Sequence, residues 1–362
     1  MIYHIYWGTS GNSGLYLDAI YKVLDSKGYK QRAFVNYYYP FDYGDKLFFK
    51  RGDVAFSKYK GKTRKIFQLI EVLKGYFLIL IYSIKDKPQL INYSHAGHSF
   101  FFIPLFLKLL KKTSKAKLII TCHDVMPHGG ISSEMKYRKK IFNIGDYLLV
   151  HNDNSRKELI EVFNEDESKI VEHLFPIMDL SKLPSTSKKY SSVDFLFIGQ
   201  MRQEKGIQLL LDVWPEFHKI EPKATLRICG KPQPGLDIEK MKLLASNTEI
   251  NLGFVTDEDY LAYVESARYV LLPYLMGSNS GVISTVLSSG ADVITSDLPM
   301  FFENPLVNDE DMFICGNKES FLSKMREKFK VNERSTKKDK LKLYNDQFIQ
   351  EVGSVYALIY NK

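Results

Sequence analysis

Residues Tyr269–Pro299 of this 362-residue chain read YVLLPYLMGSNSGVISTVLSSGADVITSDLP. The run begins with apolar and aromatic residues typical of a buried strand, and the small residues Met276 to Gly281 follow as a loop. The pattern then predicts a helix over Val282–Ser289, a stop at Gly290 and a second buried strand in ADVITSD. Strand, loop, helix and strand in this order make a βαβ unit, so the stretch predicts an α/β fold.

The loop in this stretch opens directly onto the N-terminus of the predicted helix. Free backbone N–H groups and the positive end of the helix dipole favour an anion at such a position. Ser278, Ser280 and Gly281 would let a ligand approach the backbone closely, and the serine hydroxyls add donors. A tight strand-to-helix turn that binds nothing is the alternative, and the stretch alone supports both interpretations.

A second strand-to-helix turn, Gly199–Gly206, has the sequence GQMRQEKG and carries two cations. Arg202 and Lys205 lie where the predicted strand Phe195–Ile198 gives way to the predicted helix Ile207–Phe217. A guanidinium and an ammonium at such a turn suit a diphosphate, whose negative charge they would neutralise. Two solvated surface cations are the alternative interpretation.

The first half of the chain begins with the same pattern. A strand at Ile2–Tyr6, a glycine-rich loop at Gly8–Gly14 and a helix at Leu15–Lys27 follow one another. The loop lacks the G-x-G-x-x-G dinucleotide fingerprint, but it follows a first parallel strand, where open α/β sheets bind ligands. A later predicted strand ends in His123 and Asp124 at the same kind of edge. This histidine could act as a base or donate to a substrate, although a lone histidine is more often structural.

The βα pattern occurs twice, and a segment rich in Ser, Lys and Pro at Asp179–Ser192 separates the two runs as a linker. A length of 362 residues fits two domains. We therefore predict an α/β protein with two Rossmann-like domains facing a cleft, at residues 1–178 and 193–335. Residues 336–362 are expected to form a C-terminal helix that could cross back to the N-terminal domain. The segment Pro40–Lys62 is poorly periodic and predicts an irregular excursion.

The composition is that of a globular protein, with 45% hydrophobic and 25% charged residues. The three cysteines are odd in number and widely spaced, which predicts free thiols in a reducing compartment and no metal site. No basic leader opens the chain, and the longest apolar runs, Gly75–Ile84 and Ser99–Leu110, fall short of the roughly 18 residues that a membrane span requires. We expect a protein that is soluble or bound to a membrane without crossing it.

Positive charge is concentrated in the first half. Residues 1–180 hold 27 Lys and Arg against 18 Asp and Glu, a balance of +9, whereas the remainder holds 23 against 24. This asymmetry fits nucleic acid, an anionic membrane surface or acidic substrates, and no recognition motif supports nucleic acid. The segment His95–Lys112, HAGHSFFFIPLFLKLLKK, predicts an amphipathic helix with a Phe-rich face and a basic tail. This helix would either pack on the core or dip into a membrane interface.

Several segments resemble GT-B glycosyltransferases, and most of all glycosyltransferase family 4 (group 1) of bacterial polysaccharide assembly. In the second half the matching segments are FLFIGQMRQEKGIQLLLDVW, LRICG, NLGFVTDEDYLAYVESARYVLLPY and SGVISTVLSSGADVITSDLPMFFE, in the order of the family. In the first half they are TCHDV, which resembles the family's His-Asp strand end, and KIVEHLFP before the linker. The resemblance covers nearly the whole chain and is specific mainly in the second half.

The resemblance implies roles for individual residues. It assigns His123, Arg202 and Lys205 to catalysis, with the two cations on the donor diphosphate and the histidine near the reacting sugar. The donor-binding residues that it implies are Gly199, Arg202, Lys205, Gly230, Tyr274, Ser278, Ser280, Gly281, Val282 and Thr285. The acceptor and phosphate loop that it implies comprises Gly11, Asn12, Ser13 and Gly14, together with Asp124.

The resemblance also implies an activity. It indicates a metal-independent glycosyltransferase that takes a UDP- or GDP-linked sugar as co-substrate and retains the anomeric configuration. The partners would be the nucleotide sugar and a glycan or polyprenyl-linked acceptor, with an anionic membrane surface as a further candidate. The protein would work in cell-surface polysaccharide biosynthesis, in the cytoplasm or peripherally on the inner face of the cell membrane. A catalytically inactive subunit of a glycan assembly complex is the alternative.

Two departures from the family pattern lie in the donor region. The family often carries two glutamates eight residues apart, and by register these positions are Gly277 and Thr285 here. The usual ribose contact and the usual acidic group near the sugar are therefore missing from the sequence. Arg202 is also displaced by two residues from the commoner position, which Gln200 occupies.

Overall fold

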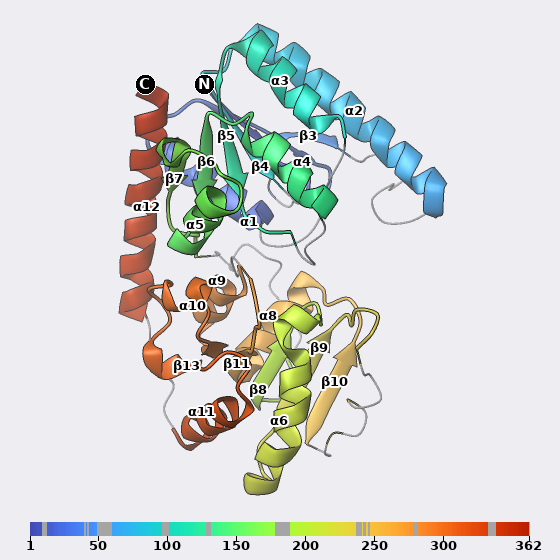
Figure 1. Cartoon of the computed structure of the whole chain (residues 1–362), viewed down its shortest axis with the longest axis vertical. Helices are drawn as coiled ribbons and strands as arrows, with labels where there is room; N and C mark the ends of the chain where they lie inside the picture. Colours follow the sequence, from blue (N-terminus) through green and yellow to red (C-terminus); the bar gives the residue numbers. More distant parts are fainter. Residues whose placement is uncertain are drawn as a thin grey trace. The chain divides into compact units, whose positions relative to one another are not determined.

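The fold was analysed in a computed structural model of the whole chain (Figure 1). It describes residues 1–8, 13–39, 41, 43–48, 60–95, 101–127, 132–177, 189–236, 241, 244, 247–277, 281–331 and 338–361. The chain divides into two compact units. The N-terminal unit comprises Met1–Pro176 and Gln347–Lys362, and the C-terminal unit comprises Ile177–Asp346.

The N-terminal unit is built on a parallel sheet with the strand order β3-β2-β1-β4-β5-β6-β7. Its strands are β1 (Ile2–Ile5), β2 (Gln31–Asn36), β3 (Asp45–Phe48), β4 (Leu90–His95), β5 (Lys117–Cys122), β6 (Tyr147–Val150) and β7 (Ile170–Glu172). Its helices are α1 (Ser13–Ser26), α2 (Gly61–Asp86), α3 (Ile103–Ser114), α4 (Ser132–Phe142), α5 (Asp153–Glu161) and most of α12 (Lys338–Asn361). Helices between successive parallel strands give the doubly wound arrangement that the sequence predicts.

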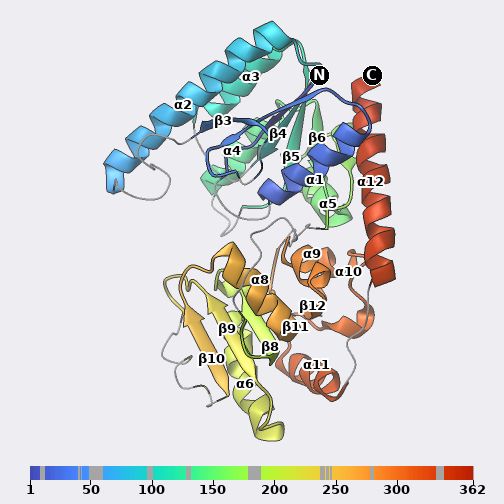
Figure 2. The same ribbon diagram turned by 180° about the vertical axis from the view of Figure 1, so that it is seen from behind.

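The two faces of this sheet are covered by different helices. Side chains of α2, α3, α4 and α5 share one apolar core with Ile91 and Tyr93 of β4. Because side chains alternate along a strand, Asn92 points to the opposite face. There its amide donates to the hydroxyl of Tyr356 on α12 at 2.9 Å. The C-terminal helix is thus fixed on the face that α2 and α3 leave open (Figure 2).

The C-terminal unit is built on a second parallel sheet, with the order β10-β9-β8-β11-β12-β13. Its strands are β8 (Val193–Ile198), β9 (Leu226–Gly230), β10 (Thr248–Leu252), β11 (Ala267–Leu272), β12 (Asp292–Ser296) and β13 (Met312–Phe313). Its helices are α6 (Ile207–Ile220), α8 (Asp257–Ser266), α9 (Gly281–Ser288), α10 (Pro299–Phe302) and α11 (Lys318–Lys330), with a short 3-10 turn, η4, at Gln203–Lys205. In chain order this sheet runs 3-2-1-4-5-6, which is the classic Rossmann order.

Local capping explains where several helices start. The side chain of Asn152 accepts a hydrogen bond from the backbone N–H of Ser155, and that of Thr256 accepts one from the backbone N–H of Asp259, so α5 and α8 each begin at a side-chain N-cap. Two predictions were wrong. The irregular excursion at Pro40–Lys62 contains strand β3, three of whose four residues pair with β2 across a register shift that blurs the alternation. The apolar run Gly75–Ile84, judged too short to span a membrane, lies within a 26-residue helix, α2, that is long and apolar enough by length and composition.

Helix α2 also corrects the expectation about membrane-length segments. By length and composition it is long and apolar enough to cross a membrane, and it is alone in this among the described helices. A third of its most apolar window, 33%, is buried inside the protein. The sequence placed the apolar run below membrane length because Lys74 divides it.

Candidate functional site

The strand order of the C-terminal sheet marks one place where a ligand can bind. Strands β8 and β11 are neighbours, and the chain leaves them in opposite directions across the sheet. In open α/β sheets, ligands bind beside the carboxyl ends of the two strands at this switch point. Here those ends lead into the turn Gly199–Gly206 and into the segment that begins at Pro273. The structure therefore brings together the two stretches that the sequence singled out.

Backbone contacts lock these two segments against each other. The N–H of Leu275 donates to the carbonyl oxygen of Glu204 at 2.8 Å. Gly206 has a φ of +69°, and a Cβ built on it would lie 1.6 Å from the carbonyl oxygen of Pro273. Only glycine tolerates both the left-handed backbone and this approach. The turn that carries the two cations is thus held on the segment leading to α9.

Lys205 is positioned by an aromatic ring. Its ammonium lies 3.6 Å from the centroid of the Tyr274 ring, a cation–π contact. Tyr274 is only 2% exposed, and its carbonyl oxygen accepts a hydrogen bond from the Cys315 thiol at 3.4 Å. A buried ring under the ammonium fixes where this charge lies.

Arg202 stands at the start of η4 and has unused donor capacity. Its terminal nitrogen Nη2 donates to the Gln200 side chain. Its Nε is buried and has no hydrogen-bond partner among the described residues. The residue at the family's commoner position, Gln200, thus contacts the displaced arginine directly. A buried donor without a partner is costly, and an anionic ligand would satisfy it.

Glycines line the carboxyl edge of the neighbouring strands. Gly199, Gly230 and Gly253 follow or end β8, β9 and β10, with φ values of +123°, +146° and +145°. The N–H of Gly253 donates to the carbonyl oxygen of Gly230 at 2.9 Å. A Cβ on Gly230 would lie 1.7 Å from the Gly199 carbonyl oxygen, whereas one on Gly199 would meet nothing within 4 Å. The backbone at Gly199 is therefore open to a ligand.

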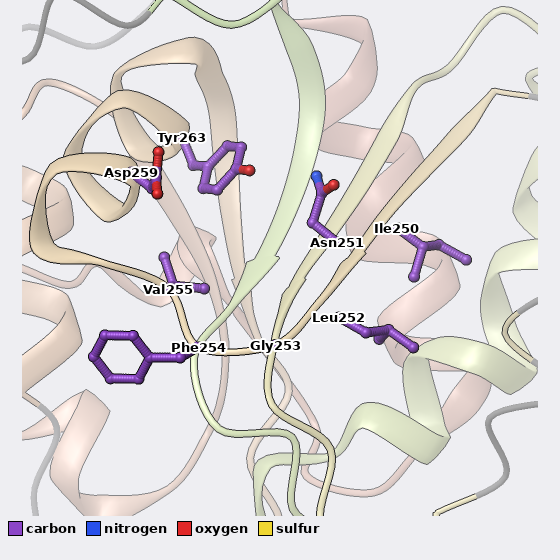
Figure 3. A pocket seen from close by; sticks show the side chains of 8 residues that line it. All are labelled: Ile250, Asn251, Leu252, Gly253, Phe254, Val255, Asp259 and Tyr263. Atoms are coloured by element: carbon purple, nitrogen blue, oxygen red, sulfur yellow. The ribbon is translucent and has the colours of Figure 1, made fainter. Parts of the chain in front are cut away.

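A pocket of about 360 Å³ continues this edge at the end of β10 (Figure 3). It is lined by Ile250, Asn251, Leu252, Gly253, Phe254, Val255, Asp259 and Tyr263. The ring of Phe254 is 78% exposed, and the amide of Asn251 donates to Glu249 at 3.0 Å. Exposed aromatic surface next to amide and carboxylate groups suits a planar polar ligand.

The N-terminus of α9 is described only from Gly281 onward. Val282 is half-buried there, and Thr285, at 3% exposed, points into the protein. Ser278 and Ser280 lie outside the described residues. Gly277 is exposed, and Met300 is the nearest side chain that a Cβ at this position would meet, at 3.1 Å.

In the N-terminal unit, His123 follows β5 as predicted. Its Nε2 is 2.8 Å from the Ser94 hydroxyl at the end of β4, and its Nδ1 is buried without a partner among the described residues. The carbonyl oxygen of Asp124 accepts a hydrogen bond from Arg138. Gly14 lies in the first turn of α1, whereas Gly11, Asn12 and the side chain of Ser13 lie outside the described residues.

Two further histidines, which the sequence analysis missed, join His123. His151 follows β6 and stacks on His123 with ring centroids 5.5 Å apart, and His173 follows β7 with its centroid 5.1 Å from His151. Tyr16 of α1 packs edge-on against His123 at 4.7 Å, and its hydroxyl lies 3.1 Å from Nε2 of His173. The carboxyl ends of three neighbouring strands therefore present one histidine cluster. The signal was in the sequence, because each histidine directly follows a short apolar strand.

The histidine cluster is neutral at physiological pH. Burial lowers the pKa of His123 and of His173 from 6.5 to about 4. Burial and the two neighbouring rings lower the pKa of His151 well below its usual value. A neutral imidazole has one donor and one acceptor nitrogen, so these rings can orient a hydroxyl group. Within the described part of the chain, no group of three or more His, Cys, Asp or Glu side chains is placed to bind a metal ion.

Comparison with known families identifies the unit that carries Arg202 and Lys205. The family described as glycosyl transferases group 1 matches residues 192–329, which include both cations and the stretch Tyr269–Pro299. The C-terminal unit is a group 1 glycosyltransferase domain. A search of curated protein sequences found no match.

Several solved structures with the same architecture align over nearly the whole chain. A glycosyltransferase from Rickettsia africae aligns with a TM-score of 0.66 and 14% identity, covering 99% of this chain and 97% of its own. Sucrose-phosphate synthase from Thermosynechococcus elongatus aligns with a TM-score of 0.67 and 13% identity, covering 100% of this chain and 99% of its own. The catalytic domain of starch synthase IV from Arabidopsis thaliana, bound to ADP and acarbose, aligns with a TM-score of 0.66 and 12% identity, covering 99% of this chain and 98% of its own.

These likenesses establish the fold of both units. The chain has the two-domain GT-B architecture, as the sequence predicted. The GT-B fold and the group 1 match over residues 192–329 together support glycosyltransferase activity with a nucleotide-sugar donor. At identities this low, the structural neighbours carry no information about the sugar, the nucleotide base or the acceptor.

Proposed function

We propose that this group 1 glycosyltransferase moves a sugar from a UDP- or GDP-linked donor to a glycan or polyprenyl-linked acceptor. The proposal includes retention of the anomeric configuration and a role in cell-surface polysaccharide biosynthesis. The observation that carries it is the pairing of Lys205 with Tyr274 at the switch point of the sheet, beside a buried Arg202 Nε that has no hydrogen-bond partner among the described residues.

In this proposal the two cations stabilise the departing nucleoside diphosphate. Negative charge develops on the diphosphate as the bond to the sugar breaks, and fixed positive groups lower the energy of that transition state. Arg202 donates through Nε, and the Lys205 ammonium supplies a point charge that Tyr274 holds in place. Both charges belong to the protein, so we propose that the reaction needs no divalent ion at the diphosphate.

The glycine edge and the pocket beyond it suit the nucleoside. The open backbone at Gly199 allows a close approach, and Gly230 and Gly253 continue the same edge toward the pocket. We assign the nucleobase to this pocket, against the exposed ring of Phe254. In the N-terminal unit, neutral His123 is our candidate for binding a sugar hydroxyl, since no described residue occupies its Nδ1.

A non-catalytic role is the alternative, because Gly277 and Thr285 replace the two acidic residues that the family often carries. Hydrolysis of nucleotide sugars by the purified protein without acceptor separates the two roles. Wild-type protein should release free nucleoside diphosphate from one member of a panel of UDP- and GDP-sugars. Turnover of none of them, with or without added polyprenyl-linked glycan, would favour the non-catalytic role.

The same assay tests the assigned cations. Replacing both Arg202 and Lys205 with alanine should reduce the rate at least about 100-fold, because two hydrogen bonds to charged groups, at roughly 1.5–3 kcal/mol each, are lost. The matched control replaces Lys219 and Lys223, which are exposed cations of the same unit, and should leave the rate unchanged. Full activity in the Arg202/Lys205 double variant would refute the proposed site.

A further inference from the structure

Helix α2 carries a continuous apolar stripe on its exposed side. Ile66, Ile70, Leu73, Phe77, Ile81 and Ile84 are all exposed, with Phe77 at 63%. At about 100° per residue these six positions fall within an arc of roughly 80°. The stripe therefore runs the length of the helix along one line, and it is separate from the face that packs on the sheet.

Helix α3 extends this stripe into a two-helix surface. The two helices lie side by side in both views (Figures 1 and 2), and Tyr76 of α2 packs on Phe106 of α3 with ring centroids 4.2 Å apart. Leu105 and Leu109 of α3, and Phe101 just before it, are exposed as well. Of the nineteen exposed large hydrophobic side chains in the described residues, nine lie on this surface. Such a concentration marks an interaction site rather than ordinary surface.

Lysines border the apolar surface. Lys74 and Lys85 of α2, and Lys108 and Lys112 of α3, are exposed at positions beside the apolar rows. The two acidic residues of α2 do not lie on the apolar stripe. Glu71 is buried, and the Asp86 carboxylate accepts a hydrogen bond from the Tyr3 hydroxyl at 2.7 Å. Helix α3 contains no acidic residue. An apolar centre with a cationic border matches the interface of an anionic bilayer.

The inner side of α2 shows that the helix lies on such a surface and does not cross it. Val72, Tyr76 and Ile79 are buried in the core of the N-terminal unit. A Cβ on Gly75 would lie 2.5 Å from the ring of Phe48, so the helix is in close contact with β3. Crossing the membrane would require α2 to leave this core and expose its sheet.

We propose that the α2–α3 surface docks the N-terminal unit onto an anionic membrane, with the exposed phenylalanine and leucine side chains among the headgroups. A second copy of the chain is the other candidate occupant. A symmetric contact would bring the bordering lysines of both copies together, and such like charges repel. The membrane therefore fits the charge of this surface better. This inference does not depend on the proposed donor site.

Flotation with lipid vesicles tests the proposal. Full-length protein should float with vesicles of equal parts phosphatidylglycerol and phosphatidylcholine, and much less with phosphatidylcholine alone. The variant F77S/L105S should lower the partition coefficient at least about tenfold, because two large apolar groups no longer enter the interface. K108E/K112E should remove the preference for phosphatidylglycerol.

A matched control has the same chemistry in the other unit. Phe302 and Leu343 are 52% and 69% exposed, close to Phe77 and Leu105 at 63% and 61%, so F302S/L343S should float like wild type. Unchanged melting temperatures would show that all variants fold, and nucleotide-induced thermal shifts would report the donor site separately. Failure of wild type to float would overturn the proposal. Retention in membranes after alkaline carbonate extraction would also overturn it, as would a wild-type dimer that F77S/L105S dissociates.

Discussion

Replacing Gly206 with alanine tests how the cationic turn is held on the segment that leads to α9. The added methyl group would lie 1.6 Å from the Pro273 carbonyl oxygen and 2.6 Å from its carbon, both backbone atoms. No rotamer change relieves such a contact, so the turn must move away from Pro273. Lys205 would then leave the Tyr274 ring, and the hydrogen bond from Leu275 to Glu204 would break.

The expected cost has two parts. A φ of +69° disfavours alanine by about 1 kcal/mol, and the backbone contact adds roughly 1–3 kcal/mol as in other overpacked sites. Gly290 provides the matched control, because its φ is +82° and a Cβ there would meet nothing within 4 Å. The Gly290→Ala variant should therefore lose only about 1 kcal/mol, and the Gly206→Ala variant about 2–4 kcal/mol.

Urea unfolding of both variants measures these differences in the free energy of unfolding, and calorimetric titration with UDP or GDP measures the effect on the site. The Gly206→Ala variant should bind the nucleotide at least about tenfold more weakly, because the Lys205 charge is displaced. Gly290→Ala should bind normally. Equal losses of stability in the two variants, with equal nucleotide affinity, would refute the reasoning.

Other predictions concern the ring under Lys205, the pocket, the histidines and α12. Tyr274→Leu should weaken UDP or GDP binding about two- to fivefold and Tyr274→Phe should not, since the contact uses the ring face. Phe254→Ala should weaken nucleotide binding without changing the melting temperature, because its ring is exposed. In the folded protein the pKa of His123 and of His173 is lowered from 6.5 to about 4, so the unfolded chain takes up protons at a higher pH. The free energy of unfolding should therefore be highest above pH 6.5 and fall as the pH drops toward about 4. The loss should be on the order of 3 kcal/mol per ring, measured by urea unfolding across that range; a constant free energy would contradict it. Tyr356→Phe should cost about 1–3 kcal/mol and speed hydrogen exchange in α12, because it leaves the Asn92 amide unpaired; unchanged exchange would exclude this role.

The βα alternation and the turn chemistry predicted much of this fold. Both concern local sequence, where a short apolar strand, a small-residue turn and an amphipathic helix follow one another within about thirty residues. Strand β3 was not predicted, because it is short and pairs with β2 across a register shift. The apolar length of α2 was underestimated because Lys74 lies within an apolar stretch that packs on the sheet on one side only.

The site was predicted only in part, because several of its contacts join residues that are far apart in the sequence. Arg202 and Lys205 were recognised by their turn, but the ring that positions Lys205 lies 69 positions further along the chain. The histidine cluster is assembled from the ends of three strands and from Tyr16. Such contacts depend on strand order, and a single histidine after a strand does not reveal that two others are its neighbours. The roles assigned to Ser278, Ser280, Gly11 and Asn12 lie outside the described residues and stay predictions.

The central claim is that the nucleoside diphosphate binds between the cationic turn and the segment that follows β11. A crystal structure of the protein with UDP or GDP tests it most directly. We predict diphosphate oxygens within about 3 Å of the Lys205 ammonium and of Arg202 Nε, with the nucleoside running along Gly199 and Gly230. A diphosphate bound away from both cations, or no bound nucleotide at saturating concentration, would contradict the account.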